Sequence, residues 1–282
     1  MSVPTATDTA LELVRVTQHY RSGFLGRRRC LFDGLSFRLG AGERWGLVGP
    51  NGSGKSTLLR LASGVEAPSS GTVRVFGSPL TSFEARRRIG YVPEGFPFPR
   101  DLDAQRALTL IGVVGGAPRD AARERARELL VRVGLGGNER RRLAHFSRGM
   151  QQRFAIAQAF VATPDLLLLD EPTTGLDALG FALLEELLAE AGARGATSLV
   201  CSHLVGDLVA HADRLAVLVE GRLRLAGTVG ELAWRGARLR VELEGIDEAG
   251  WPALVRAVES QGGRIVERAP SNQALLELFR SP

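Results

Sequence analysis

Cysteine is nearly absent from this 282-residue sequence, which contains only Cys30 and Cys201. The two cysteines lack the spacing of a metal site, and Cys201 ends the apolar run Leu199–Cys201, which favours a buried, reduced thiol. We therefore expect no disulfide or zinc framework. With 44% hydrophobic residues, the chain is long enough to bury one large core, or one large and one small core, without such support.

Long apolar runs are also missing. The longest purely aliphatic run is Leu215–Val219, and the stretch Ala107–Ala117 is interrupted by glycines. Both are far shorter than the roughly 20 apolar residues that span a bilayer, so we expect no transmembrane helix. The segment Met1–Asp8 has neither a basic start nor an apolar core, so we expect no export signal and a cytoplasmic chain.

Lysine is the scarcest charged residue. The 36 basic residues comprise 35 arginines and a single lysine, Lys55. A planar guanidinium does not fit a space shaped for a compact ammonium, so the two side chains are not interchangeable. The lone lysine therefore marks a position whose chemistry requires an ammonium group.

The arginines raise the net charge to +5 and form the triplets Arg27–Arg29, Arg86–Arg88 and Arg140–Arg142. Nucleic-acid binding is one explanation, but the triplets are scattered and no aromatic residues alternate with them for base stacking. Other arginines alternate with acidic residues, as in Arg123–Arg125, which is typical of solvated helix faces. We expect no nucleic-acid partner; anionic lipid or acidic loops of a partner protein explain the charge equally well.

Strands dominate the start of the chain. Alternating residues predict an edge strand at Ala10–Val16, followed by strands at Leu35–Leu39 and Arg44–Val48. A helix is predicted from Lys55 to Ser63, ended by Gly64. Further strands are expected at Gly71–Phe76, Ile89–Val92, Leu166–Leu169, Thr197–Cys201 and Arg214–Val219, with helices at Ala178–Ala191 and His203–Ala210.

The alternation of strands and helices predicts an α/β fold whose parallel strands are buried between helices. Helical periodicity over about residues 100–162 predicts a helical subdomain inserted into this framework. We predict one domain over residues 1–232 and a small α+β accessory domain over 233–282. The second prediction rests on strand-like and helix-like segments at Leu239–Leu243, Trp251–Ser260, Arg264–Arg268 and after Ser271.

A glycine-rich motif lies between the strand Arg44–Val48 and the helix from Lys55. It fits the phosphate-binding pattern G-x-x-x-x-G-K-[ST] in the required strand–loop–helix context. Backbone N–H groups and the helix dipole would hold phosphate, Lys55 would reach the β and γ phosphates of ATP, and Ser56 would bind Mg²⁺. The nucleotide-binding residues predicted here are Gly49, Pro50, Asn51, Gly52, Ser53, Gly54, Lys55, Ser56 and the adjoining Thr57.

A carboxylate pair follows the apolar strand Leu166–Leu169. Open α/β sheets bind ligands at the carboxyl ends of their strands, where Asp170 and Glu171 lie. Asp170 can hold Mg²⁺ directly or through water, and Glu171 can act as general base on the attacking water. Together with the phosphate loop, this pair predicts an ATP hydrolase.

The segment Phe146–Arg153, with the sequence FSRGMQQR, resembles the signature motif of the ABC ATPase family, usually LSGGQ. Ser147 and Gly149 match it, whereas Arg148 and Met150 depart from the commonest pattern and resemble variants in ATPases that export drugs, lipids and polysaccharides. The resemblance implies a P-loop NTPase core with an antiparallel β subdomain and the helical insertion. It also implies that Ser147 and Gly149 face the γ-phosphate bound by an opposite subunit.

Three further positions match the family in order, and a fourth, Glu94, departs from it. Asp177 resembles the D-loop aspartate at the dimer interface, and His203 resembles the switch histidine that contacts the γ-phosphate. Tyr20 resembles the aromatic residue that stacks on adenine. Glu94 stands where the family usually has a glutamine near Mg²⁺. Taken alone, His203 and Tyr20 would be read as structural residues and Glu94 as a solvent-exposed or loop-capping one.

The resemblance covers roughly Leu11–Leu232 and implies an ATPase subunit that dimerises head to tail with a second copy or a homologous subunit. It would drive a separate integral-membrane permease from the cytoplasmic face, with export favoured. A soluble ABC ATPase acting on ribosomes or DNA is the main alternative, but the chain shows neither a second such domain nor a long coiled coil. A small-molecule kinase leaves Ser147, Asp177 and His203 unexplained.

Overall fold

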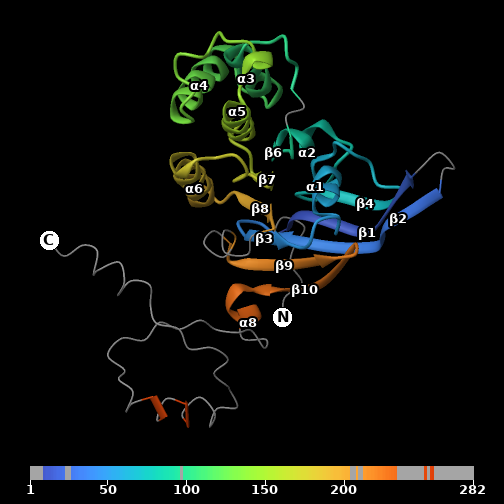
Figure 1. The fold of residues 1–282 in the computed structure, drawn as a ribbon. Coiled ribbons are helices and arrows are strands. Elements are labelled where there is room, and N and C mark those ends of the chain that lie inside the picture. Colours follow the sequence, from blue (N-terminus) through green and yellow to red (C-terminus); the bar gives the residue numbers. More distant parts are fainter. Residues whose placement is uncertain are drawn as a thin grey trace. The chain divides into compact units, whose positions relative to one another are not determined.

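A computed structural model of this chain describes residues 9–22, 27–95, 98–203, 208, 212–233, 251–252 and 255–256. The chain divides into two units, Met1–Trp234 and Arg235–Pro282. The first unit carries all of the elements discussed below (Figure 1). Among the described residues, no helix combines the length and the apolar character needed to cross a bilayer.

One sheet of this unit is antiparallel and has the strand order β2-β1-β4-β5. The sequence prediction placed an edge strand at its start, and this was wrong, because β1 pairs with both β2 and β4. The alternation of apolar and polar residues indicates only that Leu11 and Leu13 face the core. It does not indicate which strands pair with β1 on either side. The strands are β1 (Thr9–Ser22), β2 (Arg27–Gly40), β4 (Ser70–Val75) and β5 (Ser78–Pro79).

The second sheet has six strands in the order β10-β9-β3-β8-β7-β6. All of its neighbours run parallel except β10, which pairs antiparallel with β9. The predicted strands are present with nearly the expected bounds, whereas β10 was not predicted. The strands are β3 (Arg44–Val48), β6 (Ile89–Val92), β7 (Leu166–Asp170), β8 (Thr197–Ser202), β9 (Arg214–Val219) and β10 (Arg222–Thr228).

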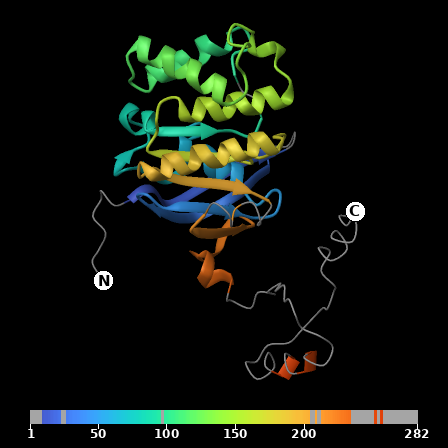
Figure 2. The ribbon, with the colours of Figure 1, turned by 90° about the vertical axis from the view of Figure 1, so that its left-hand side faces the viewer.

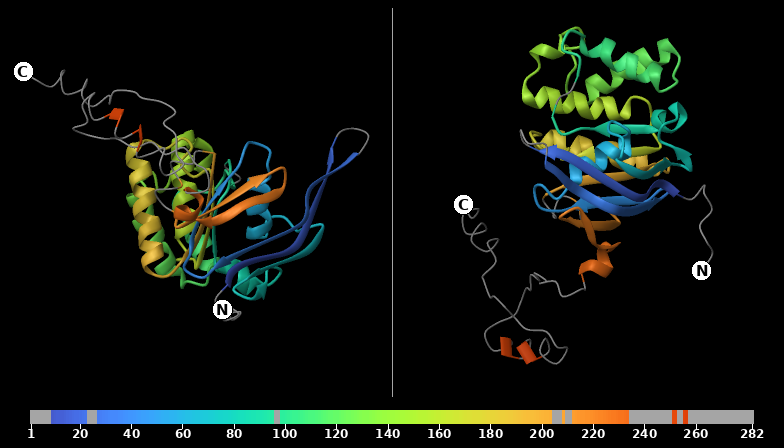
Figure 3. Two further views of the ribbon diagram at one scale, coloured as in Figure 1. Left: turned by 90° about the horizontal axis from the view of Figure 1, so that it is seen from below. Right: turned by 90° about the vertical axis from the view of Figure 1, so that its right-hand side faces the viewer.

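Strand β7 is buried on both faces, so its side chains separate two cores. Leu166 and Leu168 belong to the cluster that includes α1 (Lys55–Ser63) and the antiparallel sheet. Leu167 and Leu169 belong to the cluster formed with the helices on the other face. This period of two matches the position of α1 and of α6 (Ala178–Ala193) on opposite sides of the parallel sheet (Figure 3).

The helical insertion lies at one end of the unit (Figure 2). Its elements are α3 (Ala104–Val114), α4 (Arg119–Arg132), the short 3₁₀ helix η2 (Leu143–His145) and α5 (Arg148–Phe160). The predicted helical subdomain is therefore present as a group of packed helices. Two short helices, α2 (Phe83–Arg87) and α8 (Val229–Ala233), lie elsewhere in the unit and were not predicted.

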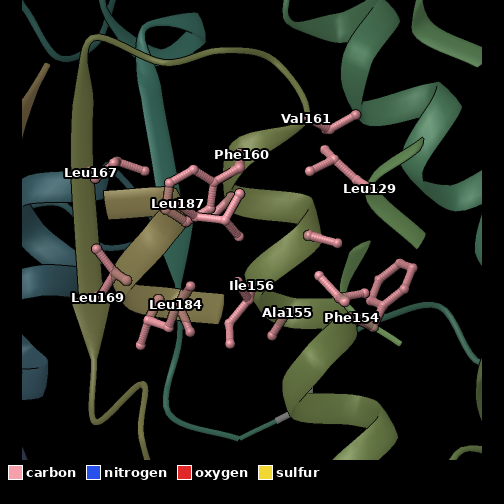
Figure 4. Packing of buried hydrophobic residues seen from close by; sticks show 14 of the residues in the cluster. Leu129, Phe154, Ala155, Ile156, Phe160, Val161, Leu167, Leu169, Leu184 and Leu187 are labelled. Carbon is pink, nitrogen blue, oxygen red and sulfur yellow. The ribbon is translucent and has the colours of Figure 1, made fainter. Parts of the chain in front are cut away.

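Helix α5 joins the insertion to the parallel sheet. Its Phe154 belongs to the same apolar cluster as Leu129 of α4, while Ile156 and Phe160 face β7 and α6 (Figure 4). The Phe154 ring also makes edge contacts with Phe98 and Phe146, with ring centroids 5.2 and 6.1 Å apart. One continuous apolar cluster therefore holds α5 between the two parts, so the start of α5 is fixed relative to the end of β7.

The two cysteines are free; Cys201 is buried in β8 and Cys30 is exposed. Burial raises the pKa of the Cys201 thiol well above its usual range, which agrees with the expected buried, reduced thiol. Most of the predicted helix His203–Ala210, and most of the predicted segments from Leu239 onward, lie outside the described residues. Residues 251–252 and 255–256, within the predicted helix Trp251–Ser260, are helical.

Candidate active site

The carboxyl ends of β3, β7 and β8 meet at one edge of the parallel sheet and border a cavity of about 760 Å³. Segments far apart in the sequence contribute to its walls, including the glycine loop, the end of β7 and the start of α5. The lining residues are Leu31, Asn51, Gly52, Gly54, Lys55, Ser56, Thr57, Pro93, Glu94, Gly95, Arg148, Gln151, Gln152, Asp170, Glu171, Thr174 and His203.

The loop between β3 and α1 depends on glycine at two positions. A Cβ atom on Gly49 would lie 2.2 Å from the Leu218 carbonyl oxygen, so no larger residue fits against β9. Gly54 precedes α1 with φ of 109°, a backbone conformation that strains other residues. The loop therefore opens α1 with its first N–H groups free of side-chain caps, on residues that line the cavity, an arrangement suited to a phosphate cradle.

Lys55 is buried at the start of α1. Its Nζ donates to the Gly49 carbonyl oxygen at 2.8 Å and lies 3.5 Å from the Pro50 carbonyl oxygen. The ammonium group is thus held under the loop by neutral acceptors, without an acidic partner among its described contacts. A cation in this position is available to phosphate oxygens bound in the loop.

Asp170 ends β7 with a side chain that is only 1% exposed. Neither carboxylate oxygen has a hydrogen-bond partner. The pKa of Asp170 is raised to about 6, chiefly by burial and also by the neighbouring Glu94 and Glu171, while Ser56 and Lys55 oppose the shift. A buried carboxylate without partners is costly unless a cation offsets it, so the site is suited to a metal ion.

Glu171 follows Asp170 with φ of 46°, in the left-handed region that non-glycine residues rarely adopt. Its Oε2 atom lies 2.9 Å from Nδ1 of His203, and its backbone N–H donates to the Cys201 carbonyl oxygen at 3.0 Å. The structure therefore brings together the predicted general base and the predicted switch histidine at the wall of the same cavity.

Glu94 and Ser56 lie side by side in the lining of the cavity. The Ser56 hydroxyl donates to Glu94 Oε2 at 3.2 Å, although the two residues are far apart in the sequence. Glu94 is solvent-exposed, but its carboxylate reaches Ser56 at the wall of the cavity. Among the described residues, no group of three or more His, Cys, Asp or Glu side chains has the arrangement of a metal site. A metal ion here would need oxygen ligands from a bound phosphate as well.

Tyr20 is not among the residues that line the cavity. Its hydroxyl donates to Glu66 Oε2 at 2.8 Å, and Glu66 also accepts from Gln18 and Arg60. Arg60 in turn donates to the hydroxyl of Thr57, which does line the cavity. The network fixes the ring beside α1, and its contact with adenine stays a prediction.

Six other predicted residues also lie outside the lining. Ser147 and Asp177 are the N-cap residues of α5 and α6, accepting from the backbone N–H groups of Met150 at 3.4 Å and Gly180 at 2.8 Å. Both Asp177 oxygens also accept from Arg153 at 2.8 Å. The residues outside the lining are Gly49, Pro50, Ser53, Ser147, Gly149, Asp177 and, as above, Tyr20. Gly49, Pro50 and Ser53 belong to the loop itself.

Several lining residues were not predicted from the sequence. Arg148, Gln151 and Gln152 come from the first turns of α5, and Thr174 comes from the loop after Glu171. Their positions in the sequence, within or next to the signature motif and the carboxylate pair, could have identified them as site residues. Leu31, Pro93 and Gly95 carry no local pattern that distinguishes them from other loop residues.

Comparison with known proteins agrees with this geometry. The family model described as ABC transporter matches residues 32–174, about half of the chain. An uncharacterized ABC transporter ATP-binding protein of Nostoc sp. is 32% identical, with 92% of this chain and 85% of that protein covered. The chain belongs to the ABC transporter family. It is an ATP-binding subunit that hydrolyses ATP, which confirms the predicted family, fold class and activity.

Two further similarities bear on this ABC subunit. The Nod factor export ATP-binding protein I of Paraburkholderia xenovorans is 36% identical, with 76% of this chain and 69% of that protein covered. The ATP-binding cassette MJ0796, solved as a dimer in a post-hydrolysis state with ADP and phosphate, superimposes with a TM-score of 0.71. It is 26% identical, and 78% of this chain and 98% of MJ0796 are covered.

The burial of Asp170 leads to a stability prediction. Because its pKa lies above that of an exposed aspartate, ionisation at pH 8 costs folded-state free energy in the nucleotide-free protein. We expect Asp170→Asn to stabilise that form by about 1–3 kcal/mol at pH 8, since a neutral amide is cheaper to bury. Urea unfolding without nucleotide measures the difference. Asp101→Asn, at an exposed position, is the control. A less stable Asp170→Asn protein would contradict the argument.

Proposed function

We propose that residues 1–232 form the motor of an exporter, which binds and hydrolyses ATP and drives a separate membrane permease from the cytoplasmic face. This proposal rests on one observation: three features lie at the same cavity. They are the phosphate loop, the buried Asp170 without hydrogen-bond partners, and the Glu171–His203 pair. The relative from Paraburkholderia xenovorans, whose name describes Nod factor export, supports the direction of transport. The transported substrate contacts the permease, so this chain does not specify it.

The phosphate loop binds the triphosphate. Backbone N–H groups between Gly49 and Thr57 surround its oxygens, and the positive end of the α1 dipole adds attraction. Lys55, held below the loop by the Gly49 carbonyl, supplies the compact charge for the β and γ phosphates. Tyr20, fixed beside α1 by Glu66, stacks on the adenine ring.

Mg²⁺ fits the oxygen atoms that face the phosphate loop. Ser56 and Asp170 would hold the ion, with Glu94 as a further acidic ligand placed by its hydrogen bond to Ser56. The two unsatisfied oxygens of Asp170 are the observation that supports this assignment. When bound, the ion supplies positive charge that offsets the carboxylates of Glu94, Asp170 and Glu171 and the developing charge on phosphate.

Glu171 acts as the general base on the attacking water, and His203 contacts the γ-phosphate. The 2.9 Å contact between them orients the carboxylate toward the cavity and keeps it close to a group that donates to phosphate. Glu171 is mostly shielded from solvent, with 16% of its side chain exposed, which limits the conformations that the carboxylate adopts.

A head-to-tail dimer completes the site. Ser147, Gly149 and Asp177 lie outside the subunit's own cavity, which fits a role toward nucleotide bound by an opposite subunit. Leu179, two residues after Asp177, is 79% exposed although it is a large apolar residue. An apolar side chain at this place suits a surface that is covered on dimerisation. The dimeric state described for MJ0796 supports dimerisation of this subunit.

The permease docks near Glu94 on the helical insertion (α3, α4, η2 and α5), which we call the helical lobe. Helix α3 exposes Leu110, Val113 and Val114, whose spacing places them on one helix face. Such an apolar face is typical of a partner-binding surface. We assign this face to an amphipathic segment of the permease.

Replacing Glu171 tests the catalytic assignment. Glu171→Gln should retain ATP binding but lower kcat by about 10²–10⁴-fold, because the general base is lost while the phosphate contacts remain. The variant should accumulate as an ATP-bound dimer, measured by nucleotide retention and light scattering. Hydrolysis near the wild-type rate would remove Glu171 from the catalytic role.

Replacing Glu94 tests the metal assignment. Glu94→Gln should keep substantial activity but require more Mg²⁺, because a hard cation gains from each carboxylate ligand and the amide preserves one oxygen. Glu94→Ala should lose activity and coupling to the permease. Mg²⁺ titrations of ATP hydrolysis compare the three proteins. Superimposable curves would show that Glu94 does not contribute to the metal site.

Replacing Leu110 tests the docking surface. Leu110→Glu should leave ATP hydrolysis by the isolated subunit unchanged and lower its co-purification with the permease by about tenfold, since a charge would be buried in the interface. Val131→Glu, at a similarly exposed position on α4, is the matched control. Equal co-purification of both variants with the permease would place the docking surface elsewhere.

A further inference from the structure

The backbone of Glu171 is held in an unfavourable conformation. Its φ of 46° lies in the left-handed region, where a Cβ atom crowds the backbone, and strain of this kind persists only when surrounding contacts impose it. The residue is also the turning point between the buried strand β7 and the loop that leads to α6. The contacts that impose this conformation therefore determine where the Glu171 carboxylate points.

Two of these contacts come from the backbone. The Glu171 N–H donates to the Cys201 carbonyl oxygen of β8 at 3.0 Å, and the Glu171 carbonyl oxygen accepts from the Thr174 N–H at 3.2 Å. The first continues the pairing of β7 with β8, and the second closes a turn within the loop. Neither connects the loop to the helical lobe.

The third contact comes from a side chain on α5. Gln152 Nε2 donates to the carbonyl oxygen of Pro172 at 2.8 Å. Proline has no N–H group, so this carbonyl is the only backbone hydrogen-bonding group of the residue that follows Glu171. Pro172 is buried, and its carbonyl would lose its protein partner if the Gln152 amide were removed.

Gln152 is well placed to hold this loop, because α5 is anchored by Phe154 and Phe160 in the apolar core. The next residue, Arg153, binds both oxygens of Asp177 at the far end of the same loop. Adjacent side chains on one rigid helix thus fasten the loop at its beginning and at its end.

We propose that Gln152 is a positioning residue for the hydrolysis of ATP: its hydrogen bond to Pro172 keeps Glu171 in the strained conformation that directs the carboxylate at the attacking water. This inference rests on the proposed role of Glu171 as general base. Gln152 itself takes no proton. Its loss would let the loop relax, and the carboxylate would move away from the reacting geometry while the phosphate loop stayed intact.

The expected signature is a loss of kcat without a matching change in KM for ATP. Misplacing a catalytic group by about 1 Å lowers the rate by up to about 10²-fold. Gln152→Leu, which has a similar volume but no donor, should lower kcat by about 10- to 100-fold, with KM within about twofold of wild type. Gln152→Lys keeps an N–H donor and should retain most of the activity.

A matched control separates this effect from general damage. Gln105→Leu makes the same substitution on α3, away from the cavity lining, and should leave kcat unchanged. Thermal unfolding of both leucine variants checks that they are folded at the assay temperature. A folded Gln152→Leu protein with wild-type kcat, or a Gln152→Lys protein as inactive as Gln152→Leu, would overturn the proposal.

A double variant distinguishes failure of this inference from failure of the proposed function. If Gln152 acts through Glu171, Gln152→Leu should lower kcat by less than about twofold in a Glu171→Gln background. A full additional loss there would mean that Gln152 acts by another route. An active Glu171→Gln protein would instead contradict the general-base assignment itself, whatever the Gln152 variants do.

Discussion

A carboxylate at the end of a fully buried strand is the constraint on which this site depends. Strand β7 is buried along its whole length, and Asp170 ends it with two oxygens that lack hydrogen-bond partners. Such a group is tolerated only at the edge of the sheet, where the cavity begins and where Lys55 and the start of α1 supply positive charge. The phosphate loop, Ser56 and Glu94 are all arranged around this buried charge.

Helix α5 transmits that arrangement to the rest of the unit. Its apolar face belongs to the same core cluster as β7 and α6, whereas its first turns carry the signature motif and line the cavity. The helical lobe is therefore connected to the catalytic edge through a packed helix. In an ATP-driven dimer, movement of the lobe would act on the loop after Glu171 through that helix.

The residues assigned to the opposite nucleotide already have structural partners in their own subunit. Ser147 caps α5, and Asp177 caps α6 while pairing with Arg153. In its cap bond Ser147 accepts from the Met150 N–H, so its hydroxyl hydrogen remains available to donate to a phosphate oxygen. Asp177 is held more tightly, which suits a residue that orders the loop at an interface.

The sequence by itself determined the features that depend on neighbours along the chain. The bounds of α1 and its end at Gly64, the strands β3, β6 and β9, and the phosphate loop follow from short-range periodicity, glycine placement and motif spacing. The family and the ATPase activity followed from the same local motifs. Tertiary structure decided what depends on segments distant in sequence, because a local pattern carries no record of which segment packs beside it. Four features are of this kind. One is the inner position of β1 in its sheet. The others are the contacts of Ser56 with Glu94, of Glu171 with His203, and of Gln152 with the Pro172 carbonyl.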